Sequence, residues 1–215
     1  MNMTKNYDAI ILPTGETSFG DRSFPVSKEA IKLFNSGRFG CIFVTGGHMG
    51  FAEVTPGFTK SEAEDTAEYL LYKGICPEKI YSDDRALETV GNFTFPIVEP
   101  QGNNPNLNDF RNMLVIGKEG HIWRMKDYTN LVFGSDKDKI DFYSVPGNHN
   151  NGLFAKVYHS ALLHALGKNR NAEEIHDFII RNHPFYSEGW YKKSPSERKV
   201  ETALVGLDWF LGIRK

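Results

Sequence analysis

The chain has 215 residues, with 25 lysines and arginines against 27 aspartates and glutamates, so its formal charge at pH 7 is -2. This balance gives no broad basic field for nucleic acid or an anionic membrane, and neither is expected as a partner. The polar start runs directly into an apolar strand without a membrane-spanning run, which predicts a soluble, cytoplasmic protein. Cys41 and Cys76 lack C-x-x-C spacing, so neither a disulfide framework nor a zinc site is expected.

Short apolar runs predict five β-strands along the first two thirds of the chain. Each run ends at glycine, proline or acidic residues, and helical spacing of apolar residues follows the first four runs. The expected strands are residues 8–12, 41–44, 80–81, 113–116 and 140–145. Because alternating strands and helices imply right-handed crossovers, the expected fold is α/β with a mostly parallel sheet of about five strands.

Only helices are expected after the fifth strand. We therefore divide the chain into an α/β domain over residues 1–151 and a helical extension over 152–215, packed on it within a single structural unit. Ser194, Pro195 and Glu197 have the spacing of a helix start with a capping box. The helix that follows has an apolar face formed by Val200, Ala203, Leu204, Leu207, Phe210 and Leu211.

The helix after the second strand begins near Glu62. Thr59 and Glu62 have the T-x-x-E spacing of a capping box, which explains a glutamate here without a ligand and contributes about 1 kcal/mol. The same residue follows the carboxyl end of a strand, where open α/β sheets bind ligands. A capping role and a role in a site both stay open for Glu62.

Polar residues gather where strands end, and these ends share one rim of a parallel sheet. His121 and Arg124 lie three residues apart on one helix face, where the first turn adds backbone donors and about half a positive charge. They predict an anion site, the alternative being a capping histidine and a solvated arginine.

Gly46 and Gly47 match no nucleotide-binding glycine motif, so their turn either approaches a ligand or is simply tight. Histidines and carboxylates with metal-ligand spacing are not found, and no metal is predicted.

Four short motifs follow one another in an order that resembles the SanA/ElyC/YdcF family. The resemblance extends over roughly residues 8–133. The motifs are Val44-Thr45-Gly46-Gly47, Ser61-Glu62-Ala63, the segment from Asp83 through Ala86, Glu88 and Thr89 to Asn92, and finally His121 with Arg124. This chain departs from the family pattern at Ala86 and Glu88, which replace serine and asparagine, and at Gly117-Lys118, which replaces small hydroxyl residues. Both departures touch the expected pocket, so the identity of the ligand stays open.

The resemblance implies a Rossmann-like three-layer fold with a C-terminal helical extension. Envelope members of the family, which are linked to cell-wall precursor metabolism, generally start with a membrane segment. This chain starts on its first strand and looks like the soluble YdcF branch. For that branch the resemblance implies binding of S-adenosylmethionine, without an established methyl transfer.

We therefore expect a YdcF-like protein that binds a nucleotide-like or phosphorylated small molecule, with S-adenosylmethionine as the first candidate. Its reaction is unassigned, and transfer or hydrolysis are the classes considered. Glu62 and Asp83 would act as hydrogen-bond acceptors or general bases, and His121 would supply a proton. The expected ligand-binding residues are Gly15, Gly46, Gly47, Ser61, Thr89, Asn92, Lys118 and Arg124. The alternative is a non-catalytic ligand-binding or protein-interaction module, whose helical tail docks a partner. The oligomeric state stays open.

Overall fold

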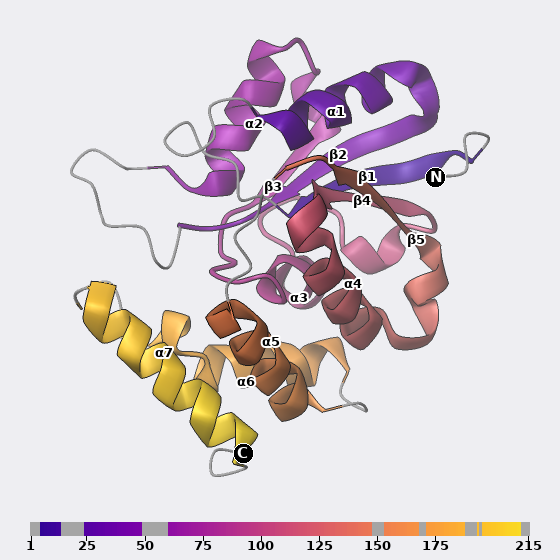
Figure 1. Ribbon diagram of the computed structural model, residues 1–215. Helices are drawn as coiled ribbons and strands as arrows, with labels where there is room; N and C mark the ends of the chain where they lie inside the picture. Colours follow the sequence, from indigo (N-terminus) through magenta and orange to yellow (C-terminus); the bar gives the residue numbers. More distant parts are fainter. Residues whose placement is uncertain are drawn as a thin grey trace.

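Five parallel strands form the centre of the protein (Figure 1). The computed structural model describes residues 5–13, 24–48, 60–147, 153–167, 171–187, 193 and 195–211. The strands are β1 (Tyr7–Pro13), β2 (Phe39–Thr45), β3 (Ile80–Asp83), β4 (Met113–Lys118) and β5 (Ile140–Val145), in the order β3-β2-β1-β4-β5. All four pairings between neighbours are parallel, which confirms the predicted α/β fold with its five strands.

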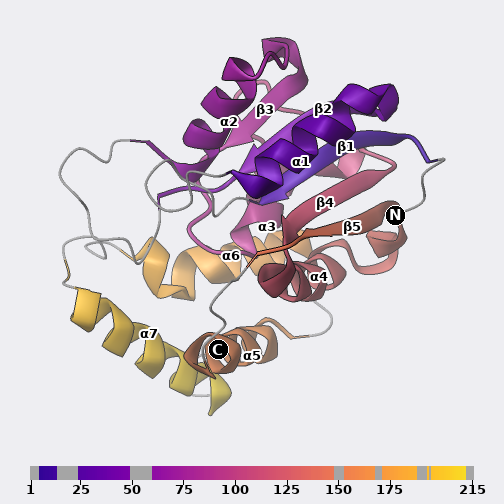
Figure 2. The same ribbon diagram turned by 45° about the horizontal axis from the view of Figure 1, so that its top comes forward.

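Alternate residues of the central strand face two helical layers. Ile10 and Leu12 pack with α1 (Pro25–Leu33) and α2 (Glu62–Tyr72) on one face of the sheet (Figure 2). Ile11 packs on the other face, where α3 (Gly91–Val98) and α4 (Glu119–Phe133) lie. An uninterrupted apolar strand has to be covered on both faces, and the two helical layers provide this cover. The chain changes faces after β3, so its topological switch point lies between β1 and β4.

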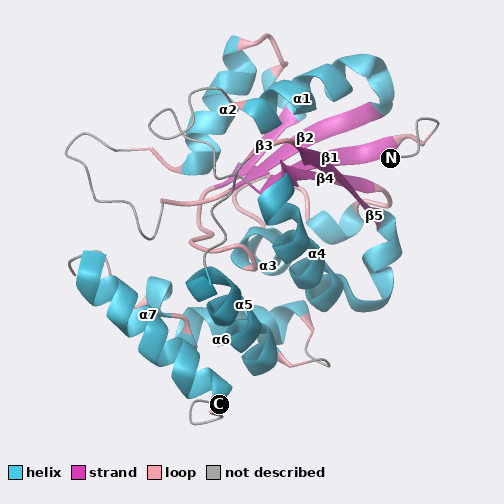
Figure 3. Ribbon diagram, in the orientation of Figure 1, coloured by secondary structure: helices cyan, strands magenta, loops and turns pink. Residues whose placement is uncertain are grey.

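Three further helices lie beyond α3 and α4 (Figure 3). They are α5 (Leu153–Leu166), α6 (Ala172–Asn182) and α7 (Pro195–Phe210). Ile97 and Val132 of the sheet-facing helices belong to the same buried cluster as Leu162, Phe178 and Trp209 of the C-terminal helices. One hydrophobic core therefore continues from the sheet into the helical extension.

The apolar face expected for α7 is not the face that packs on the protein. Val200, Leu204, Leu207 and Leu211 are 52 to 60% exposed. The packing face instead carries Arg198, Thr202, Val205 and Trp209, all of them buried. The sequence pattern found the apolar stripe, but Trp209 and its neighbours on the opposite face bury more of the helix.

Three other features concern the cysteines, membrane spans and metal ligands of the described residues. Cys41 is buried and Cys76 is exposed, and neither is in a disulfide. Among the helices of the described ranges, none is both long enough and apolar enough to cross a membrane. Within those same ranges, no three histidine, cysteine, aspartate or glutamate side chains are grouped in a way that could hold a metal ion.

Candidate functional site

The glycine turn, Gly46 with Gly47, joins the end of β2 to the loop after β3. The Gly46 N–H group donates to the carbonyl oxygen of Asp83 at 3.0 Å, and the Gly47 N–H group donates to that of Ala86 at 2.6 Å. A Cβ atom at Gly47 would lie 2.6 Å from the carbonyl oxygen of Asp84, so a larger residue would displace the chain. Glycine is needed here because two backbone segments of the protein itself approach so closely.

The start of α2 is closed by the glycine turn and by its own capping box. The Glu62 N–H group donates to the carbonyl oxygen of Gly47 at 3.1 Å, and the Ala63 N–H group donates to that of Gly46 at 2.9 Å. Ser61 Oγ accepts from the Glu64 N–H group at 3.0 Å, and Glu64 Oε2 accepts from the Ser61 N–H group at 2.7 Å. The first amides of α2 therefore all have partners within the chain.

The capping box predicted from Thr59 and Glu62 is wrong. The N-cap is Ser61 and its partner is Glu64, while Thr59 lies outside the described residues. Two overlapping sequences, T-x-x-E and S-x-x-E, both fit a capping box, and the glycine turn favours the second by fixing where the helix starts. Glu62 is consequently the first helical residue, and its side chain is not needed as a cap.

Glu62 and Lys118 stand at the starts of two helices on opposite faces of the sheet, and the charge of Lys118 acts on the Glu62 carboxyl. Burial raises the pKa of the partly buried Glu62 carboxyl to about 8, and the positive charge of Lys118 opposes part of that rise. Lys118 ends β4 and occupies the N-cap position of α4, where no side chain caps the helix. Unlike α2, helix α4 thus begins with a cation at its N-cap position, and this side chain does not cap the helix.

Asp83 anchors the loop after β3. Its buried carboxylate accepts hydrogen bonds from Arg85 Nε at 3.0 Å and from Arg85 Nη2 at 2.6 Å. Arg85 also contacts the Glu99 carboxylate at 3.4 Å. Because a two-point contact with guanidinium holds the carboxylate in one orientation, Asp83 would have to leave this pair before it could act as a general base.

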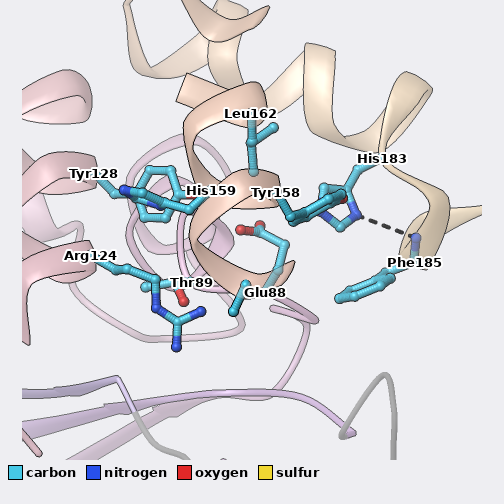
Figure 4. A pocket seen from close by; sticks show the side chains of 10 residues that line it. Glu88, Thr89, Arg124, Tyr128, Tyr158, His159, Leu162, His183 and Phe185 are labelled. Atoms are coloured by element: carbon cyan, nitrogen blue, oxygen red, sulfur yellow. Dashed lines mark hydrogen bonds between the residues drawn. The ribbon is translucent and has the colours of Figure 1, made fainter. Parts of the chain in front are cut away.

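Thr89, His121 and Arg124 meet on the α3 and α4 side of the rim. Thr89 Oγ1 lies 3.0 Å from His121 Nε2, which connects the loop before α3 to the first turn of α4. Arg124 follows three residues later, and burial lowers the pKa of its guanidinium group. Figure 4 shows the Arg124 side chain reaching from α4 toward Thr89. The structure therefore brings Thr89 together with His121 and Arg124, which belong to a different sequence motif.

A cavity of about 190 Å³ opens beside these residues. Its walls come from the loop before α3, from α4 and α5, and from the short 3-10 turn Pro184–Tyr186 (Figure 4). The lining residues are Glu88, Thr89, Arg124, Tyr128, Ala155, Tyr158, His159, Leu162, His183 and Phe185. Six of these ten come from residues after 152, so the helical extension forms one side of the cavity.

Glu88 supplies the carboxyl group of the cavity. Its two oxygens accept hydrogen bonds from the N–H groups of Val90 and Gly91, both at 2.6 Å, so that Glu88 caps the start of α3. The Tyr186 hydroxyl accepts from the Leu87 N–H group at 2.9 Å and hydrogen-bonds to Glu88. Burial raises the pKa of Glu88 to about 7 in spite of these donors. This acid therefore titrates near neutral pH.

Two histidines in the wall have defined hydrogen bonds. His183 Nδ1 accepts from the Phe185 N–H group at 3.3 Å, so the ring proton lies on Nε2 and is donated to the Tyr158 hydroxyl oxygen at 2.9 Å. Burial lowers the pKa of His183 to about 3, which keeps the ring neutral. His159 Nε2 lies 3.0 Å from Asp127 Oδ2, and burial also lowers its pKa. Both rings are fixed by the protein.

The remaining predicted residues have other positions. Ser61, Gly46, Gly47 and Asp83 support the backbone around the rim, as described above. Asn92 is buried in α3 and its Oδ1 atom has no hydrogen-bond partner among the described residues. Gly15 lies outside the described residues.

Sequence reasoning placed Glu88 at the expected pocket but assigned it no role, and it missed the cavity wall formed by Tyr128, Tyr158, His159 and His183. The signal for Glu88 was its departure from the family pattern, since a glutamate replaces an amide just before Thr89. Tyr158, His159 and His183 had no such signal, because they follow the matched motifs and come together only through the packing of α5 and α6.

No protein-family model matches the chain, and a search of curated proteins finds no match either. Function is therefore inferred from the chemistry of the site itself.

Proposed function

We propose that the protein binds a nucleotide-like or phosphorylated small molecule, that an anionic group of this ligand lies at the rim beside Arg124, and that the protein catalyses a transfer or hydrolysis on the ligand. The observation that carries the proposal is the position of Arg124. Its guanidinium group lines the cavity next to the hydrogen-bonded pair of Thr89 and His121. Arginine binds phosphate or carboxylate oxygens through two parallel hydrogen bonds, and burial strengthens such contacts.

The charge balance of the site favours an anion near neutral pH. Lys118 and Arg124 carry positive charge, and two carboxyl groups near them in the described part of the chain have raised pKa values. These values are about 8 for Glu62 and about 7 for Glu88, so neither acid is fully ionised at pH 7. The amino end of α4 adds the positive end of its dipole.

The same groups provide acid and base chemistry. Glu62 is mostly protonated at pH 7 and can donate a proton, as a general acid does. His121, held by Thr89, lies on the same side of the rim as Arg124, which can stabilise developing negative charge. An acid, a histidine and a fixed cation are the groups that group transfer or hydrolysis at a phosphorylated centre requires.

The position in the fold supports the proposal. Ligands of open α/β sheets bind at the carboxyl ends of strands near the topological switch point, which here lies between β1 and β4. Lys118 ends β4 on this side. The resemblance to the YdcF branch makes S-adenosylmethionine the first ligand to test, with phosphorylated sugars and nucleotides beside it.

Native mass spectrometry of freshly purified protein tests the proposal directly. We expect a co-purified small molecule, or binding of added S-adenosylmethionine, AMP or ribose 5-phosphate that titration calorimetry can measure. The binding should require Arg124. A protein that carries no small molecule, and binds none of the three compounds, would contradict the proposal.

The exposed face of α7 favours a second role, in protein contacts. Val200, Leu204, Leu207 and Leu211 form an apolar stripe that the described part of the protein leaves uncovered. Such a stripe is typical of a helix that packs against another protein. Light scattering behind size exclusion, comparing wild type with Leu204→Glu, tests for self-association. Equal molar masses of one chain for both would argue against a second copy on this face.

A further inference from the structure

We propose that the cavity receives the planar ring of the ligand, a neutral heteroaromatic ring with N–H groups on its edge such as the base of a nucleotide, and that the C-terminal helices supply its walls. This inference rests on the proposed binding of an anion at the rim. It adds an orientation, with the ring inside the cavity and the negatively charged group at Arg124.

The size of the cavity fits a single ring system. Its volume is about 190 Å³. An apolar cavity of roughly 150 Å³ holds one benzene molecule, so this one has room for a ring with one or two substituents. It is too small for a whole nucleotide, whose sugar and phosphate would remain outside. Tyr128, Tyr158 and Phe185 present aromatic rings to this space. Aromatic walls favour a flat, apolar surface.

Glu88 gives the cavity a specific polar contact. Figure 4 shows its carboxyl group directed into the space between Tyr158 and His159. In its ionised form, which is present in part at pH 7, the Glu88 carboxyl has about four acceptor positions. The N–H groups of Val90 and Gly91 and the hydroxyl of Tyr186 supply three donors. About one acceptor position remains, which an N–H group on the edge of a ring would satisfy and a plain hydrocarbon ring would not.

Arg124 selects the charge of the ring. It lines the same cavity as Glu88, so a cationic ring would enter against the repulsion of a guanidinium group. An anion placed deep in the cavity would instead face the carboxyl group of Glu88. A neutral ring in the cavity with an anion at Arg124 avoids both conflicts.

The C-terminal helices fix the walls. His183 donates from Nε2 to the Tyr158 hydroxyl oxygen at 2.9 Å, which sets the position of the tyrosine on α5. Ring contacts of His183 with Phe185 and Tyr158, at centroid distances of 4.6 and 5.8 Å, hold the same group together. A substitution that tests the ring site should therefore fill the cavity from α5 and leave the contacts that hold its walls intact.

Ala155 and Val157 offer such a change and its control. Ala155 lines the cavity from α5 and is partly exposed, so Ala155→Phe places a ring in the cavity without a large core rearrangement. Val157 is 59% exposed on the same helix and does not line the cavity, which makes Val157→Phe the matched control. Calorimetry would measure AMP, GMP, CMP, UMP and ribose 5-phosphate with wild type and both variants, after thermal unfolding has shown that the variants fold. Ala155→Leu replaces Ala155→Phe if the larger side chain prevents folding.

We expect at least one nucleotide to bind wild type tenfold or more tightly than ribose 5-phosphate. Ala155→Phe should abolish that advantage and leave ribose 5-phosphate binding unchanged, and Val157→Phe should behave as wild type. If no nucleotide exceeds ribose 5-phosphate, or if Ala155→Phe keeps the advantage, the cavity is not the ring site, although the anion site at the rim stands. If neither the nucleotides nor ribose 5-phosphate bind wild type, the result contradicts both the ring site and an anion site for these compounds.

Discussion

Thr89 Oγ1 lies 3.0 Å from His121 Nε2, and this contact joins the loop before α3 to the first turn of α4. The two residues are 32 positions apart in the chain, and each follows a different strand. The contact gives His121 one fixed ring orientation next to Arg124, which a functional histidine requires. The first prediction tests that orientation.

Thr89→Val keeps the shape of the side chain and removes its hydroxyl group. Loss of one hydrogen bond is worth about 0.5 to 1.5 kcal/mol, so affinity for an anionic ligand should fall by about twofold to tenfold. Titration calorimetry measures the change. Thr94→Val is the matched control, because Thr94 Oγ1 on α3 has no hydrogen-bond partner among the described residues. Equal losses in both variants would show that the Thr89 contact is not specific to the site.

Arg124→Lys preserves the positive charge and removes the two-pronged geometry of guanidinium. Loss of a charge-assisted hydrogen bond costs about 1.5 to 3 kcal/mol, or about tenfold to a hundredfold in affinity. Arg181→Lys is the control, since Arg181 lies exposed on α6 and pairs with Asp177 of the same helix. Calorimetry with the bound ligand compares the two variants. Wild-type affinity in Arg124→Lys would remove Arg124 from the site.

The three inner strands β1, β2 and β4 could be predicted from the sequence because each is an apolar run covered on both faces. Ile10, Ile11 and Leu12 are buried whichever face they point to, so no alternation was needed to find β1. Parallel order followed from the alternation of strands and helices. That order in turn placed Thr89, His121 and Arg124 on one rim, and the structure brings them together.

The cavity could not be predicted, because its walls depend on how α5 and α6 pack. Tyr158 and His183 are 25 residues apart and meet only in the folded protein. That Ser61 rather than Thr59 caps α2 likewise depends on a tertiary contact, namely the hydrogen bonds from the start of α2 to the carbonyl groups of the glycine turn. Local spacing finds candidates for such roles, but the choice between them comes from packing.

Ser61→Ala should lower the free energy of unfolding by about 1 kcal/mol, because it removes the side-chain acceptor at the start of α2. Chemical denaturation measures this change. Ser160→Ala, at an exposed position within α5, is the control and should have little effect. Ligand affinity should stay the same in both variants, since Ser61 acts as a cap. A large loss of affinity with unchanged stability would assign Ser61 to the ligand instead.

His183 should make the protein sensitive to acid. Its pKa is lowered from 6.5 to about 3 in the folded protein, so below pH 6.5 the unfolded chain binds a proton that the folded protein does not. The contribution to stability is complete above pH 6.5 and declines as the pH falls toward 3, at up to about 1.4 kcal/mol per pH unit. His183→Asn, less stable overall, should show a shallower decline between pH 6 and 4. His164→Asn on the exposed side of α5 should keep the wild-type slope.

Glu62 should have the opposite effect, in the alkaline direction. Its pKa is raised from 4.5 to about 8 in the folded protein, so between these values the folded protein holds a proton that the unfolded chain has lost. Stability is fully present below pH 4.5 and falls as the pH rises toward 8, at up to about 1.4 kcal/mol per pH unit. Glu62→Gln cannot ionise, and its stability relative to wild type should therefore increase from pH 5 to pH 8.5.

The same substitution separates the role of Glu62 in ligand binding from its role in stability. An anion bound near Glu62 would favour the protonated carboxyl, so wild-type affinity should weaken as the pH rises through 8, whereas the affinity of Glu62→Gln should change less over that range. Glu68→Gln, at an exposed position on α2, is the control for both measurements. Denaturation curves and calorimetry at pH 5, 7 and 8.5 provide the data. If wild type and Glu62→Gln lose stability in parallel, Glu62 titrates as an ordinary surface carboxyl; if their affinities also change in parallel, it lies outside the anion site.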